Sequence, residues 1–214
     1  MTYIPLIDPN DVENFRRTER EKEAFFLFTI FVAGKTAKVI AGKAHLFHKD
    51  LIEYQKKHNP EYVESDEVGV LKRLDLIPID VIHSSLKRNK IGKYTTLNKL
   101  FTQLQEYPID INNTKVAEIE ALPGIGKKTS RYFMLYTFAN LPDMAILDRH
   151  VLTYLRNLGY DTPKNTPSGK QYDEIEKLFL FVYKNISNFK GTLTEFDLAI
   201  WKNKGYLLGN ENID

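Results

Sequence analysis

Apolar residues recur at three- and four-residue spacing through almost the whole chain, and Pro, Gly or Asn separates these segments. Such spacing places apolar side chains on one face of an α-helix. It predicts helices over residues 17–32, 35–47, 66–76, 78–87, 94–106, 114–122, 129–140, 148–158, 172–186 and 192–204. A buried strand is an alternative only for FFLFTIF, residues 25–31. We therefore expect an all-α fold of short helices.

The composition excludes several kinds of site. The chain has 214 residues, enough for one compact domain or two small lobes. It contains no cysteine, which excludes disulfides, thiolate zinc sites and cysteine-ligated iron–sulfur clusters. Its net charge is only +2, so a nucleic-acid interface would have to come from local clusters of basic residues. No apolar run is long enough to span a bilayer and no signal-peptide pattern opens the chain, so we expect an intracellular protein without membrane contact.

Two glycines flank one apolar residue in ALPGIGKKTSRYF, residues 121–133. Between two predicted helices, Gly124 and Gly126 permit a tight turn whose backbone N–H groups can bind phosphate oxygens. Ile125 can pack between the two helices as an apolar pin. A plain helix–turn–helix corner without a ligand is the alternative from spacing alone.

This segment resembles the helix–hairpin–helix of DNA-binding proteins, which contacts the DNA backbone without reading bases. Lys128 occupies the position where bifunctional helix–hairpin–helix DNA glycosylases carry their catalytic lysine. Asp148, in MAILDRHVLTYLRNLGY, matches the catalytic aspartate of that superfamily. AILDRHVLTYL and LTEFDLAIW (residues 193–201) are most similar to the small archaeal and bacterial 8-oxoguanine DNA glycosylases. The resemblance runs from about residue 23 to residue 201.

The resemblance implies a two-lobed helix–hairpin–helix DNA glycosylase fold. Residues 35–140 would form a central lobe with the hairpin motif at 114–140, and residues 1–34 plus 141–214 a second lobe, with the active site between them. The implied activity is bifunctional: excision of 8-oxoguanine from damaged double-stranded DNA and AP lyase cleavage through a lysine Schiff base, in base excision repair. The implied protein is a cytoplasmic, nucleoid-associated monomer without a cofactor, although the hairpin can hold a structural monovalent cation.

The resemblance also assigns roles to individual residues. Lys128 would be the nucleophile and Asp148 would stabilise positive charge on the sugar, with a solvated lysine and a helix N-cap as the alternatives. The remaining candidates are DNA-backbone contacts (Gly124, Ile125, Gly126, Lys127), hole-filling or wedge residues (Lys35, Leu86, Lys87, Arg88) and base-pocket residues (Asp197, Trp201). A solvated basic turn is the alternative for the wedge segment, and a core position is the alternative for Trp201.

The lesion is less well determined than the chemistry. The archaeal subgroup ends in a lysine that helps to recognise the oxidised base, whereas this chain continues through residues 204–214 and ends in Asp214. Removal of a different damaged or modified base is therefore one alternative, and a non-catalytic DNA-binding module is another. The resemblance gives His150 a structural role, and the other histidines, His45, His48, His58 and His83, have no carboxylate or histidine partners at metal-ligand spacing, so we predict no catalytic metal.

Overall fold

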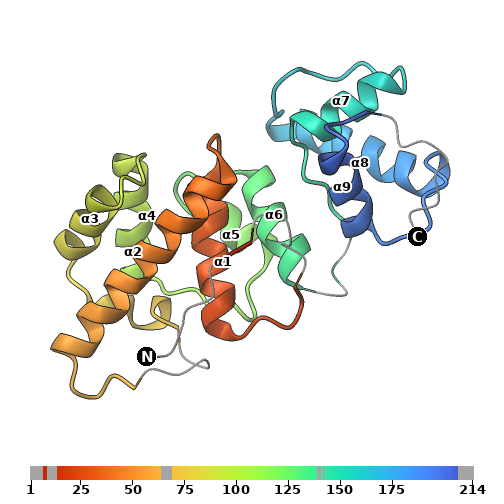
Figure 1. Cartoon of the computed structure of the whole chain (residues 1–214). Helices are drawn as coiled ribbons and strands as arrows, with labels where there is room; N and C mark the ends of the chain where they lie inside the picture. The colour runs from red at the N-terminus through yellow and green to blue at the C-terminus, as the bar shows by residue number, and fades with distance from the viewer. Residues whose placement is uncertain (1–6, 9–13, 64–68, 139–140, 142, 207–214) are drawn as a thin grey trace. The chain divides into compact units, whose positions relative to one another are not determined.

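The computed structural model describes residues 7–8, 14–63, 69–138, 141 and 143–206, and all the regular structure among them is helical (Figure 1). The chain divides into two compact units, unit 1 (Met1–Ile125) and unit 2 (Gly126–Asp214). The predicted all-α class is thus confirmed for the described residues, and the strand alternative for residues 25–31 is wrong. No helix in these ranges has both the length and the apolar character needed to cross a membrane.

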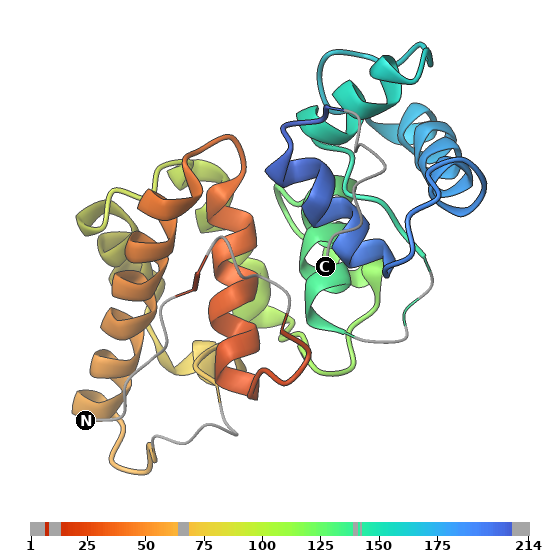
Figure 2. The same ribbon diagram turned by 45° about the vertical axis from the view of Figure 1, so that its right-hand side comes forward.

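Unit 1 contains five α-helices and one 3-10 helix within its described part. They are α1 (Glu19–Val32), α2 (Ala37–His58), η1 (Leu71–Leu76), α3 (Ile79–Arg88), α4 (Tyr94–Glu106) and α5 (Val116–Glu120). Helix α1 lies alongside α2 (Figures 1 and 2). The ring of Phe47 on α2 lies 5.4 Å from that of Phe31 on α1 and 5.4 Å from that of Phe101 on α4. Aromatic contacts therefore join three helices into one core.

Helix α1 is buried around most of its circumference, because its apolar residues form a continuous run instead of one stripe. Every residue from Glu23 to Phe31 is buried, including the carboxylate of Glu23. Thr18 caps the helix: its side chain accepts a hydrogen bond from the Glu21 amide, and the Glu21 carboxylate accepts one from the Thr18 amide. This reciprocal capping box fixes where the helix begins.

Unit 2 is built from α6 (Lys127–Thr137), α7 (Arg149–Asn157), α8 (Gly169–Asn185) and α9 (Leu193–Lys202). Phe196 on α9 is at the centre of its core. The Phe196 ring lies 5.6 Å from Tyr154 on α7, 5.5 Å from Phe179 on α8 and 5.2 Å from Phe189 in the connection before α9. One aromatic side chain thus holds α7, α8 and α9 together.

The two units have different bounds from the predicted lobes. Helix α1 packs on α2 in unit 1, and α6 belongs to the unit that also contains α7, α8 and α9. The compact units therefore divide the chain at residue 125, whereas the predicted central lobe ran from residue 35 to residue 140. The predicted packing of the N-terminal helix with the C-terminal helices stays a prediction.

Candidate active site

The turn before α6 requires glycine at its first position. Gly124 has a φ of +78°, a left-handed conformation that side chains disfavour. A Cβ on Gly124 would also lie 2.2 Å from the Cγ2 atom of Thr96 on α4. The amide of Ile125 donates to the carbonyl of Leu122 at 3.1 Å, and the Ile125 side chain is buried. This turn is therefore tight and packed against α4.

The second glycine has a different environment. Gly126 is the N-cap of α6, it is exposed, and a Cβ there would meet no atom within 4 Å. Its carbonyl accepts the first helical bonds, from the amides of Thr129 and Ser130. The earliest N–H groups of a helix have no acceptor inside the helix, which suits them to a phosphate group. The predicted backbone and cation binding at this hairpin stays a prediction.

The two lysines at the start of α6 differ in their partners. Lys127 forms an ion pair with Asp173 on α8, and this hydrogen bond holds the pKa of the Asp173 carboxyl below its usual value. Lys128 is one residue, and so about 100° of helix rotation, away. Its amine makes no hydrogen bond or ion pair within the described residues. Lys128 is therefore the lysine whose amine is available to a substrate.

Asp148 is the N-cap of α7, as the alternative from the sequence predicted. Its Oδ1 atom accepts hydrogen bonds from the amides of His150 at 2.7 Å and Val151 at 3.0 Å. Both bonds use the same oxygen, and the second oxygen, Oδ2, accepts no hydrogen bond from the residues that the structure describes, so it can take another partner. The cap and a charge-stabilising role are compatible, because the cap fixes the orientation of the carboxylate.

Helix α8 fixes the extended segment that leads to Asp148. The Tyr172 hydroxyl donates to the Ala145 carbonyl at 2.6 Å and accepts from the Leu147 amide at 3.2 Å. The Glu176 carboxylate accepts from the Ala145 amide at 2.9 Å and from the Arg131 side chain of α6 at 2.6 Å. These bonds connect the helix that carries Lys128 with the segment that carries Asp148.

Asp197 on α9 lies within the electrostatic field of both candidate catalytic residues. Tyr136 on α6 donates a 2.6 Å hydrogen bond to its carboxylate, and both side chains are buried. The pKa of Asp197 is raised to about 7, mainly by burial and also by the charge of Asp148, while the Tyr136 hydrogen bond and the Lys128 charge oppose this rise. Lys128, Asp148 and Asp197 therefore form one charged cluster in unit 2.

Trp201 lies one helical turn beyond Asp197 and is 39% exposed, so the core alternative for this tryptophan is wrong. Its ring makes an edge-to-face contact with His150, with centroids 6.4 Å apart. His150 immediately follows Asp148 and Arg149 at the start of α7. An exposed indole beside the charged cluster offers a flat apolar surface.

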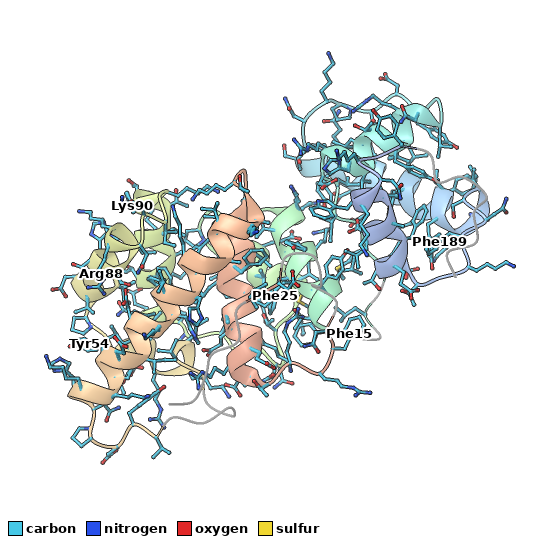
Figure 3. The ribbon with its side chains drawn as sticks, in the orientation of Figure 1. Phe15, Phe25, Tyr54, Arg88, Lys90 and Phe189 are labelled. Atoms are coloured by element: carbon cyan, nitrogen blue, oxygen red, sulfur yellow. The ribbon has the colours of Figure 1, made fainter. Side chains whose placement is uncertain are left out.

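The wedge candidates lie at the end of α3, in unit 1. Leu86 is fully buried, so this residue is a wrong prediction: a core side chain cannot insert between bases. Lys87 is exposed, and Arg88 pairs with Asp50 at 2.7 Å while its side chain stays 65% exposed (Figure 3). The wedge role of Lys87 and Arg88 and the hole-filling role of Lys35 stay predictions.

Sequence reasoning missed the residues that position the cluster, which are Tyr136, Tyr172, Glu176 and Arg131. For the ion pairs, the spacing of the charged residues in the sequence was an available signal. Lys127 and Arg131 are four residues apart, and their partners Asp173 and Glu176 are three apart, so each pair shares one helix face. The tyrosines carry no comparable signal, because tyrosine occurs at both buried and exposed positions and its place in the sequence does not show its hydrogen-bond partner.

This chain is similar to a known protein over part of its length. A curated protein of Picrophilus torridus named 8-oxoguanine DNA glycosylase/AP lyase is 34% identical over 83 residues. The aligned region covers 39% of this chain and 37% of that protein, so it spans little more than a third of the relative. The chain matches no protein-family model and no solved structure. The match indicates a relationship with DNA glycosylases.

Proposed function

We propose that this protein is a DNA glycosylase with AP lyase activity that excises 8-oxoguanine from double-stranded DNA in base excision repair. The observation that carries the proposal is the cluster in unit 2, in which the charges of Lys128 and Asp148 both act on the buried carboxyl of Asp197. The partial match to a protein with this printed name supports the same activity. A module that only binds the DNA backbone requires no such cluster.

In this proposal, the target nucleotide rotates out of the duplex before the chemical step. The neutral Lys128 amine uses its lone pair to bond to the sugar C1′ atom. The glycosidic bond breaks, its electron pair leaves with the base, and the base takes up a proton. Asp148 stabilises the positive charge that develops on the sugar. Its fixed orientation at the start of α7 suits this role.

The attached nitrogen then loses a proton, and the sugar ring opens to give a Schiff base between C1′ and Lys128. Loss of a proton from C2′ expels the 3′ phosphate by β-elimination, and water releases the lysine. The absence of an ion pair at Lys128 among the described residues supports its role. Lys127 does not fit the nucleophile role as well, because Asp173 holds its amine.

The same proposal assigns recognition of the flipped base to Trp201 and Asp197. The exposed Trp201 ring would stack on the base, and Asp197, one helical turn earlier, would form a hydrogen bond with it. A carboxyl whose pKa is near 7 can donate as well as accept a hydrogen bond near neutral pH. The hairpin Gly124–Gly126 would hold the DNA backbone of a monomeric enzyme in the cytoplasm.

Borohydride trapping tests this proposal. Wild type, Lys128→Gln, Asp148→Asn and the control Lys164→Gln are incubated with duplexes that carry 8-oxoguanine, uracil, an oxidised pyrimidine or only normal bases. Lys164 is an exposed lysine in the connection between α7 and α8, and its substitution makes the same charge change. We expect a covalent adduct on 8-oxoguanine with wild type and Lys164→Gln, and none with Lys128→Gln.

The pattern across the duplexes separates the alternatives. An adduct on another lesion alone would support the same chemistry with a different substrate. DNA binding without an adduct on any duplex would support the non-catalytic module. Circular dichroism of each variant shows whether a lost adduct reflects lost folding.

A further inference from the structure

Three lysines of unit 1 gather where two turns meet. Lys35 lies in the turn between α1 and α2, Lys43 lies in the second turn of α2, and Lys93 immediately precedes α4. The connection between α1 and α2 and the connection between α3 and α4 lie at the same end of unit 1 in both ribbon views (Figures 1 and 2). The three residues together are named the lysine triad below.

Each lysine of the triad holds the opposite turn by a hydrogen bond to its backbone. Lys35 donates to the carbonyl of Ile91, and Lys43 donates to the adjacent carbonyl of Lys90 at 2.9 Å. In the reverse direction, Lys93 donates to the carbonyl of Ala33 at 2.9 Å. All three bonds join the α1–α2 region to the α3–α4 turn, so the three ammonium groups are fixed close to one another.

The triad has no anionic partner among the described residues. No ion pair joins any of its amines to a carboxylate, and the nearby Asp50 is engaged by Ser85, Arg88 and Asn89. Burial lowers the pKa of Lys35, and the charges of Lys93 and Lys43 lower it further. Three like charges held together without a counter-ion repel one another, so binding an anion there would relieve unfavourable energy.

The geometry leaves donors available for that anion. An ammonium group has three N–H donors, and the recorded carbonyl bonds use one on each lysine. Two donors per lysine therefore remain for further acceptors. A phosphate group offers several oxygen acceptors and negative charge, and lysine is a common phosphate ligand. Lys90, exposed and adjacent to the triad, extends the positive surface beyond one phosphate (Figure 3).

We propose that Lys35, Lys43 and Lys93 form a binding site for a phosphodiester group of the DNA backbone on unit 1. The choice of DNA as the source of the phosphate rests on the proposed function. The site is made of other residues than those of the glycine hairpin and of the cluster around Lys128, and it needs no damaged base. Its binding is therefore independent of sequence and of lesion.

The test measures binding of an undamaged duplex by fluorescence anisotropy over a range of salt concentrations. Lys43→Gln is compared with Lys57→Gln, a matched control on the same helix. The two positions are 14 residues apart in α2, about 21 Å along its axis. We expect Lys43→Gln to weaken binding several-fold and to make the slope of log affinity against log salt shallower by about 0.9. The double variant Lys43→Gln/Lys93→Gln should lose about twice that slope, and Lys57→Gln should match wild type.

Two further measurements keep the result interpretable. Lys43→Arg retains the charge and a donor, so it should restore most of the affinity, and thermal unfolding of every variant checks that the two turns stay folded. Inorganic phosphate is titrated as the free-anion alternative. Identical salt slopes for Lys43→Gln and Lys57→Gln would overturn the site. Inorganic phosphate that binds at the triad at millimolar concentration without displacing the duplex would also overturn the proposed DNA site. If Lys43→Gln has the shallower salt slope but the wild-type protein gives no borohydride adduct, the phosphate site is supported and the glycosylase activity is rejected.

Discussion

The Tyr136 hydroxyl donates a 2.6 Å hydrogen bond to the carboxylate of Asp197, and both side chains are withdrawn from water. The bond joins α6, which carries Lys128, to α9, which carries Trp201. It stabilises the ionised form of a carboxyl whose burial favours the protonated form. The balance between these effects makes Asp197 sensitive to pH near neutrality.

The pKa of Asp197 predicts a pH-dependent stability. In the folded protein the carboxyl of Asp197 has a pKa of about 7, whereas the ordinary pKa of an aspartate is 3.8. Between these values the folded state binds more protons, so its stability falls as pH rises from about 4 to 7 and then levels. Asp197→Asn has no carboxyl to titrate, so it should not show this fall in stability. Relative to wild type, the variant should gain about 2 to 3 kcal/mol of unfolding free energy between pH 5 and pH 8 in urea titrations. The control Asp161→Asn, at an exposed position, should show no such gain. A difference in unfolding free energy between Asp197→Asn and wild type that stays the same at every pH would contradict the raised pKa of Asp197.

Tyr136→Phe removes the hydrogen bond and keeps the ring. We expect it to lower the unfolding free energy by about 1 to 3 kcal/mol at pH 8, because an ionised buried carboxylate loses its donor. The loss should be smaller at pH 5, where Asp197 is protonated. Urea unfolding at both pH values measures this difference, and an equal loss at both would show that the bond does not favour the ionised form.

Asp148 allows its cap to be separated from its charge. Asn caps helices about as well as Asp, so Asp148→Asn should change the unfolding free energy by less than about 0.5 kcal/mol, whereas Asp148→Ala should lower it by about 1 kcal/mol. Both variants should lose most of the borohydride adduct, because neither has the carboxylate. Full trapping by Asp148→Asn would assign Asp148 a structural role alone.

The two glycines of the hairpin should respond differently to the same substitution. Gly124→Ser places a side chain at a φ of +78° and against Thr96, so it should lower the unfolding free energy by more than about 1 kcal/mol. Gly126→Ser enters open space at an N-cap, where serine is favoured, and should be neutral or stabilising. Thermal denaturation of the two variants measures the contrast. Equal destabilisation would contradict the described turn.

Tyr172 should act as a positioning residue for Asp148. Tyr172→Phe removes the hydroxyl that bonds to Ala145 and Leu147. The matched control Tyr183→Phe removes a 2.9 Å bond to the Gly191 carbonyl elsewhere in unit 2. Each should lower the unfolding free energy by about 1 to 3 kcal/mol. Only Tyr172→Phe should slow single-turnover trapping at saturating protein, and equal rates would show that Tyr172 has only a structural role.

The helices were largely predictable because local patterns determine them. Residues 94–106 were predicted and form α4 with the same bounds, and Asp148 caps α7 as expected. Helix α2 continues past the predicted end at residue 47 to His58, because Leu51, Ile52 and Gln55 extend its buried face. Residues 66–76 were predicted as helix, and the described part forms the 3-10 helix η1 with a kink at Arg73. The helix predicted over residues 114–122 is the shorter α5, which begins at Val116 after its N-cap Lys115.

The candidate site was predictable only where single residues carry a motif. Lys128, Asp148, Asp197 and Trp201 follow from the resemblance, but the buried partner of Asp197 is 61 residues away in the sequence. The bonds of the lysine triad join residues 47 to 60 positions apart, so the cluster exists only in the folded chain. Leu86 was misassigned because a short basic segment does not show which of its side chains faces the core.

The most direct test of the central claim locates the covalent bond. The borohydride-trapped complex with 8-oxoguanine DNA is digested with nuclease and trypsin, and the modified peptide is sequenced by mass spectrometry. We predict a sugar remnant on Lys128, with trypsin still cleaving after Lys127 and no longer after Lys128. A remnant on any other lysine, or no remnant in a protein that binds the duplex, would contradict the assignment of Lys128 as the nucleophile.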